Sequence, residues 1–379
     1  MAELTKNLHF LKNGTEQTAK IYTTASEAGN NYITVKVDGT TGYVPIGDIG
    51  NINATMGMVN KSGNTYTILY SKLLSLTRTT ATPLSVARKD LAATSVGDYA
   101  LFGGGRGGSN SSTVDAYNTS LTRTIPTPLS VARYYLVAAS VGNYALFGGG
   151  SYKDIVDAYD TSLTRTTATP LSVPRSFLAA TSVGNYALFG GGSNQTTVDA
   201  YDASLIRTTA TPLSAGRSYL AATTVGDYAL FGGGMRSDYS STVDAYNTSL
   251  TRTIPTPLSV ARYYLAATSV GNYALFGGGS GKDTVDAYDT SLTRTTATPL
   301  SVGRGELVAA SVGNYALFGG GSYKDIVDAY DTSLIRTIPT PLSVGRSYLA
   351  STTVGNYALF GGGYNRSAYS NTVDAYTIS

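Results

Sequence analysis

Short apolar runs separated by turn residues recur along most of this chain. In one stretch the runs are Leu136–Val141 (LVAASV), Tyr144–Phe147 (YALF), Ile155–Tyr159 (IVDAY) and Leu163–Thr167 (LTRTT). Runs of about four to eight residues that are rich in β-branched and aromatic side chains and bounded by Gly, Asn or Pro are typical of β-strands. Because these stretches lack the 3.6-residue periodicity of an amphipathic helix, the pattern predicts four consecutive strands and no helix.

The same segment occurs seven times between Leu76 and the C-terminus. Each copy has an arginine before the first run, a glycine triplet after the second run and a VDAY sequence in the third, and successive copies lie 42 or 45 residues apart. A repeat of this length with four antiparallel strands is typical of one blade of a β-propeller. We therefore predict an all-β fold, with a seven-bladed β-propeller over residues 73–379.

Two details of the repeat predict how each blade is built and how the ring closes. Gly142-Asn143 places glycine at the first central position of a two-residue turn, as a type II′ hairpin requires. An outer-strand sequence, Leu74–Thr82, precedes the first complete unit, whereas the last unit ends after Thr372–Tyr376 without one. We expect these two segments to pair in one blade, which leaves no open edge in the ring.

The sequences YALFGGG, VDAY and PLSVAR carry a resemblance to the kelch family, which extends from Leu76 to Tyr376. The resemblance implies a kelch-type propeller. Kelch units usually have a tryptophan in the fourth strand, where this chain has threonine or isoleucine. We therefore expect an outer strand that is lighter and more polar than in that family.

Residues 1–72 lack the repeat. Alternation of apolar and polar residues predicts strands near Thr18–Thr24, Tyr32–Val37, Gly42–Ile46 and Thr65–Tyr70. The segment is interpreted as a small all-β module, and a module of this size has a marginal core unless it oligomerises or docks on a partner.

Two motifs in this segment, GYVPIGDI and NKSGNTYTIL, resemble the N-terminal modules of tail proteins from phages and prophages of Gram-positive bacteria. The resemblance implies that residues 1–72 anchor the chain to other particle proteins and that the protein is a homo-oligomer. The first residues, MAELTKNLHF, do not have the basic-then-apolar pattern of a signal peptide. We therefore expect a virion or phage-tail-like particle protein that is made in the bacterial cytoplasm and acts outside the cell.

Composition excludes several kinds of chemistry. The chain has no Cys and one His, His9, which excludes disulfides, thiolate chemistry and any site that needs two imidazoles. The net charge of +3 provides no strong attraction for nucleic acid, and no apolar run approaches the roughly 18–20 residues that span a bilayer. We predict no cofactor, no metal site, no nucleic-acid partner and no membrane insertion.

The seven units differ mainly in the two residues after each repeated arginine and in the loop after each glycine triplet. Strand order in a propeller places both sets on one face, and their aromatic, charged and amide side chains suit stacking on sugar rings and hydrogen bonding to hydroxyls. A protein partner would use the same residue types, and drift of unconstrained loops would also produce variation. The candidate ligand-binding residues are Lys89, Asp90, Arg106, Tyr134, Tyr135, Tyr152, Lys153, Phe177, Asn194, Tyr219, Arg236, Tyr239, Tyr263, Tyr264, Lys282, Glu306, Tyr323, Lys324, Tyr348, Tyr364, Arg366 and Tyr369.

The repeated arginines allow two interpretations, a ring-shaped anion site or a scaffold of ion pairs with the VDAY aspartates. We favour ion pairs, because an arginine and an aspartate recur together in every unit and a guanidinium matches a carboxylate. The second set of arginines, in the LTR sequences of the outer strands, is expected to be solvated. The paired residues are Arg88, Arg133, Arg175, Arg217, Arg262, Arg304 and Arg346 with Asp115, Asp157, Asp199, Asp244, Asp286, Asp328 and Asp374.

Three functions are compatible with this sequence. The first is a non-enzymatic particle component whose propeller binds a ligand on the host surface. We favour a glycan over a protein as that ligand. The second is a polysaccharide-degrading enzyme, for which Asp90, Asp238, Asp283 and Glu306 are the available carboxylates on the variable face. The third is an intracellular kelch scaffold that binds a protein partner. We predict the first and expect no catalytic residues.

Overall fold

The computed structural model describes residues 76–378 together with the backbone of five strands nearer the N-terminus. The chain divides into two compact units, Met1–Leu74 and Ser75–Ser379. In the first unit β1 (Asn7–Lys12) pairs with β2 (Thr15–Lys20), and β3 (Tyr32–Val37) lies between β4 (Thr40–Pro45) and β5 (Tyr66–Leu69). β3 has the predicted bounds, whereas positions 21–24, 46, 65 and 70 of the other predicted strands lie outside the described residues.

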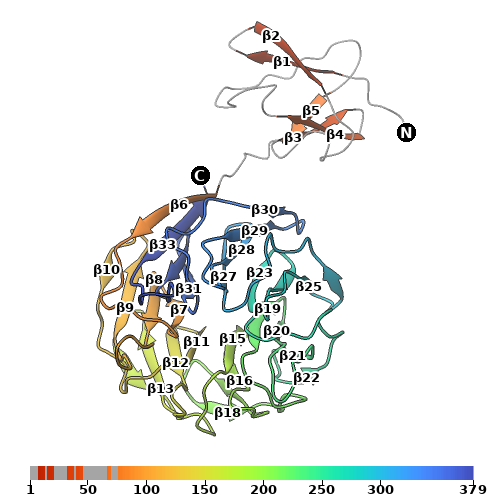
Figure 1. Cartoon of the computed structure of the whole chain (residues 1–379). Coiled ribbons are helices and arrows are strands. Elements are labelled where there is room, and N and C mark those ends of the chain that lie inside the picture. The colour runs from red at the N-terminus through yellow and green to blue at the C-terminus, as the bar shows by residue number, and fades with distance from the viewer. Residues whose placement is uncertain are drawn as a thin grey trace. The chain divides into compact units, whose positions relative to one another are not determined.

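The second unit is a ring of seven four-stranded antiparallel sheets, the blades of a β-propeller (Figure 1). From the axis outward, blade 1 contains β7 (Ala92–Val96), β8 (Tyr99–Gly103), β9 (Val114–Asn118) and β10 (Arg123–Thr124). Blade 2 contains β11 (Val137–Val141), β12 (Tyr144–Gly148), β13 (Val156–Asp160) and β14 (Arg165–Thr167). Blade 3 contains β15 (Ala179–Val183), β16 (Tyr186–Gly190), β17 (Val198–Tyr201) and β18 (Arg207–Thr209). Blade 4 contains β19 (Ala221–Val225), β20 (Tyr228–Gly232), β21 (Val243–Asn247) and β22 (Arg252–Thr253). Blade 5 contains β23 (Ala266–Val270), β24 (Tyr273–Gly277), β25 (Val285–Asp289) and β26 (Arg294–Thr296). Blade 6 contains β27 (Val308–Val312), β28 (Tyr315–Gly319), β29 (Val327–Asp331) and β30 (Arg336–Thr337). Blade 7 contains β31 (Ala350–Val354), β32 (Tyr357–Gly361), β33 (Val373–Ile378) and β6 (Leu76–Ala81).

The tight turns follow the local sequence. Val141 pairs with Tyr144 across Gly142-Asn143, and only the glycine has a positive φ, of 52°, as expected for a type II′ turn. The outer strand of the blade begins at Arg165 and not at the predicted Leu163. Leu163 instead adopts a φ of 62° in the turn that follows β13, with its N–H bonded to the carbonyl of Asp160 at 2.9 Å.

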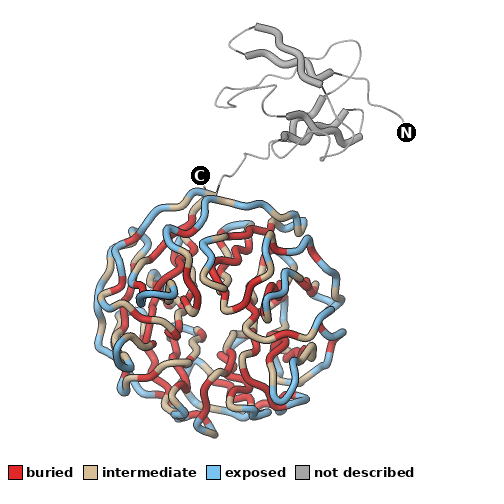
Figure 2. The backbone as a smooth tube through the Cα atoms, viewed as in Figure 1, coloured by how far each residue is buried: buried red, intermediate tan, exposed pale blue. Residues whose placement is uncertain are grey.

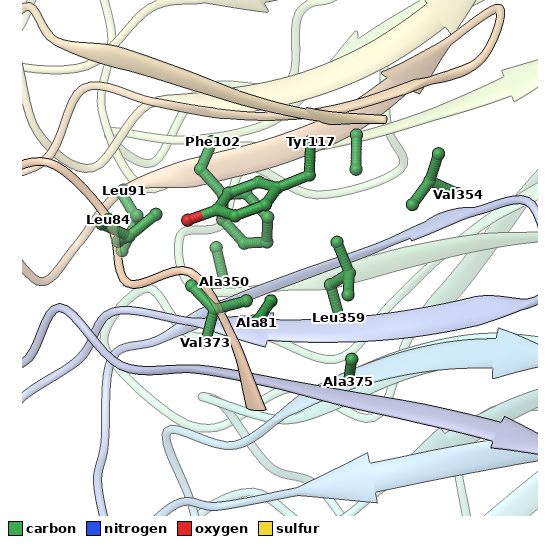
Figure 3. Close-up of a cluster of buried hydrophobic side chains, with 11 residues drawn as sticks. Ala81, Leu84, Leu91, Phe102, Tyr117, Ala350, Val354, Leu359, Val373 and Ala375 are labelled. Atoms are coloured by element: carbon green, nitrogen blue, oxygen red, sulfur yellow. The ribbon is translucent and has the colours of Figure 1, made fainter. Parts of the chain in front are cut away.

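The ring closes as predicted, with the N-terminal strand of the propeller completing the last blade. β6 pairs antiparallel with β33, in a register that runs from Val373 opposite Ala81 to Ile378 opposite Leu76. An apolar cluster joins blade 7 to blade 1 at the same place, with Phe102 and Tyr117 packed among aliphatic side chains of the last blade (Figure 3). Closure therefore uses both a β-ladder and a hydrophobic interface, and it removes the exposed edge of β33.

The interfaces between blades repeat around the ring. Each contains a phenylalanine from the second strand and the VDAY tyrosine of the same blade in an edge-on contact, such as Phe147 and Tyr159 with centroids 5.9 Å apart. The first glycine of each triplet faces the phenylalanine of the next blade, and a Cβ on Gly148 would lie 2.7 Å from the ring of Phe189. Most buried positions lie inside the ring, and most exposed positions lie along its outer rim (Figure 2). The glycine therefore sets how closely successive blades approach each other.

The innermost strands enclose an axial channel of about 260 Å³. Its lining consists of Leu136, Val137 and Ala138 and their equivalents in the other blades, which are Leu, Val or Ala except for Ser351. Small side chains on the first strands fit the narrow axis, where seven blades converge.

Candidate ligand-binding face

The repeated arginines form buried ion pairs with the VDAY aspartates, as predicted. The seven Arg–Asp distances lie between 2.6 and 2.8 Å, and all fourteen side chains are at most 1% exposed. In blade 3, for example, one guanidinium nitrogen of Arg175 donates to Asp199 and to the carbonyl of Phe189. These arginines are structural groups inside each blade and do not form an anion site at the channel.

The expectation that the outer arginines are solvated is wrong. Their side chains are only 23–26% exposed, and each lies 2.8–3.7 Å from the second oxygen of the same aspartate. Asp286, for example, accepts from Arg262, from Arg294 and from the backbone N–H of Ser259. A buried carboxylate with spare lone pairs draws in the second guanidinium, because the third and fourth strands are adjacent.

On the face where the units differ, a ring of seven residues surrounds the propeller axis. Each blade contributes one residue, the second after its buried arginine. The N–H of each member donates to the carbonyl of the equivalent residue in the preceding blade, at 2.9–3.3 Å, and the cycle closes from Asp90 to Tyr348. All seven have φ values between 54° and 62°, a region that non-glycine residues seldom occupy. We call this set the axial ring; it consists of Asp90, Tyr135, Phe177, Tyr219, Tyr264, Glu306 and Tyr348.

Aromatic side chains cover much of the axial ring. The Phe177 ring lies 4.2 Å from that of Tyr135 and 4.4 Å from that of Tyr219, and Tyr219 lies 4.4 Å from Tyr264. Burial raises the pKa of Tyr135 to about 12 and also raises the pKa of Tyr219 and Tyr264. These hydroxyls therefore remain protonated donors at neutral pH.

The two carboxylates of the axial ring have different partners. Asp90 accepts a 2.8 Å hydrogen bond from Arg106 Nε. Burial raises the pKa of Asp90, whereas Lys89 and Arg106 act to lower it. Glu306 accepts a hydrogen bond from the hydroxyl of Tyr348 through Oε1. Within residues 76–378, the axial ring therefore carries one carboxylate bound to a guanidinium and another whose one hydrogen-bond partner is a phenol.

Cations lie over several of the tyrosines outside the axial ring. The Arg106 guanidinium lies 4.6 Å from the centroid of the Tyr134 ring. Lys89 Nζ lies 5.2 Å from the centroid of Tyr364, and the Arg366 guanidinium lies 4.9 Å from that of Tyr323. These contacts join loops after the glycine triplets to one another and to the segment after Arg88, so the two variable sets do share a face, as the strand order predicted.

The other predicted residues divide into two groups. Tyr239 lies 4.8 Å from Tyr263, Tyr369 lies 5.4 Å from Tyr364, Tyr152 lies 6.5 Å from Phe177, and Asn194 accepts a hydrogen bond from Ser218. Four others are exposed, and their side chains have no hydrogen bond or ion pair within residues 76–378. These four are Lys153, Arg236, Lys282 and Lys324.

A pocket of about 360 Å³ opens on this face where blades 5, 6 and 7 meet. Its lining includes five predicted residues, Tyr263, Tyr264, Glu306, Tyr323 and Arg366, brought together from four separate segments. Four lining residues were missed from the sequence: Ser280, Gly281, Gly305 and Ser322. The two glycines could have been found by aligning the seven units, because most other units have larger side chains at both positions.

The carboxylates considered for catalysis do not gather at one place. Asp90 and Glu306 are separated in the axial ring by Tyr348, and Asp238 and Asp283 are exposed in the loops of different blades. Among the described residues, no group of three His, Asp or Glu side chains could hold a metal ion, and no helix could span a membrane.

Comparison with known proteins supports the fold. No protein-family profile matches the chain, and no curated protein sequence matches it. Among solved structures, that of YjhT is similar, with a TM-score of 0.52 and 12% identity over 79% of this chain and 99% of that chain. At this identity the likeness concerns the fold alone. The kelch and phage-tail resemblances remain predictions from the sequence.

Proposed function

We propose that this protein is a non-enzymatic binding component of a phage or phage-tail-like particle, with a kelch-type propeller that recognises a glycan on the host surface. One observation carries the proposal: tyrosines, charged groups and serines gather around a pocket on the face where the repeats differ. Aromatic faces stack on the C–H surfaces of sugars, and the polar groups can bond to hydroxyls. The repeated residues then serve as a rigid scaffold, and residues that break the repeat bind the ligand.

In this proposal residues 1–72 attach the chain to other particle proteins as a homo-oligomer. Several copies in one particle add avidity to individually weak sites. The support for this part is the pair of motifs in residues 42–49 and 60–69. Particles assembled with a chain that lacks residues 1–72 test it: we expect the shortened chain to be missing from purified particles, and its incorporation at the wild-type level would contradict the anchoring role.

A glycan array probed with the full-length protein tests the binding function. The matched variants are Tyr263→Ala, in the pocket, and Ile125→Thr, at an exposed position just after β10 where four other units have threonine. We expect glycan binding by the wild type, weaker binding by Tyr263→Ala and unchanged binding by Ile125→Thr. Absence of binding by folded wild-type protein would contradict the function, and release of oligosaccharides during incubation would favour the enzyme.

A further inference from the structure

Two glycines distinguish the pocket at blades 5 to 7 from the equivalent places in other blades. Gly281 occupies the loop position held by Tyr152, Asn194 and Tyr323 in the other units with short loops. In blade 2 the Tyr152 side chain lies beside Phe177, the axial-ring residue of the next blade. Gly281 has the same relation to Glu306, and no atom lies within 4 Å of the Cβ that it lacks. The space above Glu306 is therefore open where the equivalent space above Phe177 holds a tyrosine.

The second glycine leaves a backbone donor without a partner. In three equivalent places, the N–H that corresponds to that of Gly281 donates to a serine hydroxyl: Tyr152 to Ser176, Asn194 to Ser218, and Tyr323 to Ser347. Blade 6 has Gly305 where those units have serine. Within residues 76–378 the Gly281 N–H has no hydrogen bond. It is thus a donor available to a ligand at the wall of the pocket.

Two charged groups of the pocket also have positions at which a ligand can form a hydrogen bond or an ion pair. Glu306 is bound through Oε1 by Tyr348, and its other oxygen has no hydrogen bond among the described residues. The exposed Arg366 guanidinium is stacked on Tyr323, and no carboxylate of residues 76–378 lies within 4.0 Å of it. A carboxylate accepts from sugar hydroxyls, whereas a guanidinium pairs with a carboxylate or phosphate.

We propose that this pocket is the single ligand site of the propeller and that it binds one acidic sugar unit of a glycan. Tyr263 and Tyr264 provide aromatic surface, Glu306 and the Gly281 N–H bind hydroxyl groups, and Arg366 binds the carboxylate or phosphate substituent. The volume of about 360 Å³ lies at the lower end of the range of about 300–1,000 Å³ for small-molecule sites. The inference rests on the proposed function and restricts it to one site in a ring of seven blades.

Gly281→Tyr is the decisive variant. Tyr152 and Tyr323 already have φ values of 54° and 59° at the equivalent position, close to the 71° of Gly281, so the substituted chain is expected to fold. The new side chain fills the space above Glu306. Tyr152→Gly, the reverse change in blade 2, is the matched control, and Gly305→Ser restores the hydroxyl that competes for the Gly281 N–H.

The variants are compared on an array that carries uronate-containing, sugar-phosphate and neutral glycans. For the glycans that the wild type binds, Gly281→Tyr should weaken binding at least about tenfold and Gly305→Ser more mildly, whereas Tyr152→Gly should have no effect. Arg366→Gln should cause a loss of about tenfold or more, the usual effect of removing a charged hydrogen bond. The uronate and phosphate arms distinguish the two anionic substituents.

Each outcome decides a separate statement. If the folded wild type binds no glycan, the proposed function itself fails. If Gly281→Tyr binds as the wild type does, the function stands and the assignment of the site is wrong. If neutral glycans bind as tightly as acidic ones and Arg366→Gln has no effect, the site stands and the acidic ligand is wrong. Equal loss in Tyr152→Gly and Gly281→Tyr would show more than one site per ring.

Discussion

The buried Arg–Asp–Arg groups allow a comparison between two blades of one chain. Arg88 and Arg304 have similar surroundings, because each donates to the carbonyl two residues before it and to a phenylalanine carbonyl. Each also forms an ion pair with an aspartate, at 2.8 Å for Arg88 and 2.7 Å for Arg304. The outer arginines differ. Arg336 lies 3.0 Å from Asp328, whereas Arg123 lies 3.7 Å from Asp115. The pair Arg88→Met and Arg304→Met therefore tests what the outer arginine contributes.

Methionine keeps the apolar stem of each arginine, so the change removes mainly charge and hydrogen bonds. Loss of one partner of a buried ion pair costs about 3–5 kcal/mol. In Arg304→Met the remaining carboxylate keeps the short bond to Arg336, and a hydrogen bond to a charged group contributes about 1.5–3 kcal/mol. We expect a loss of about 3–5 kcal/mol for Arg88→Met and a loss smaller by at least about 1 kcal/mol for Arg304→Met.

Urea unfolding followed by tyrosine fluorescence measures both losses, since the chain has 30 Tyr and no Trp. Ile125→Thr, at an exposed outer position, is the control and should change the free energy of unfolding by less than about 0.5 kcal/mol. Equal losses for the two methionine variants, or a larger loss for Arg304→Met, would refute the reasoning that the outer arginine compensates for the inner one.

Three further predictions concern packing, closure and pH. Gly148→Ala places a Cβ 2.7 Å from the Phe189 ring and should lower the free energy of unfolding by about 1–3 kcal/mol through overpacking; a wild-type urea midpoint would contradict this. Internal deletion of residues 76–81 exposes the edge of β33 and should lower the melting temperature and produce aggregates on size-exclusion chromatography; a monodisperse, equally stable product would show that the strand is dispensable. Burial raises the pKa of the VDAY tyrosines, such as Tyr117 and Tyr159, above the ordinary value of about 10. Above about pH 10 the folded state therefore holds more protons than the unfolded state. The free energy of unfolding should consequently fall as the pH rises. A melting temperature that stays constant from about pH 9 to pH 11 would oppose that sign.

Much of the fold could be predicted because each blade repeats a pattern that acts over short distances. The strands of blade 2 begin and end within two residues of their predicted positions. The phase of the repeat also predicted that β6 completes blade 7, because the last unit lacks its own outer strand. The main local error was Leu163, whose apolar character suggested a strand although its backbone takes a left-handed turn conformation.

The site could be predicted less completely. Comparison of the units pointed to the right face, and the pairing of Lys89 with Arg106 brings the two variable loop sets together. The same comparison selected residues by the side chains that they have, so it passed over Gly281 and Gly305, whose contribution is the space and the free N–H that they leave. It also misjudged the outer arginines, since their pairing depends on a carboxylate in the neighbouring strand.

The sequence by itself determined the number of blades, their strands and the closure of the ring, because these follow from apolar runs, turn residues and repeat phase, which act locally or between identical neighbours. Only the tertiary structure decided which of the differing residues meet. Asp90 and Tyr348 are more than 250 residues apart in the chain and adjacent in the axial ring. Seven nearly identical blades converge on one axis, so a few substitutions in separate repeats come together there and make one face of a symmetric scaffold asymmetric.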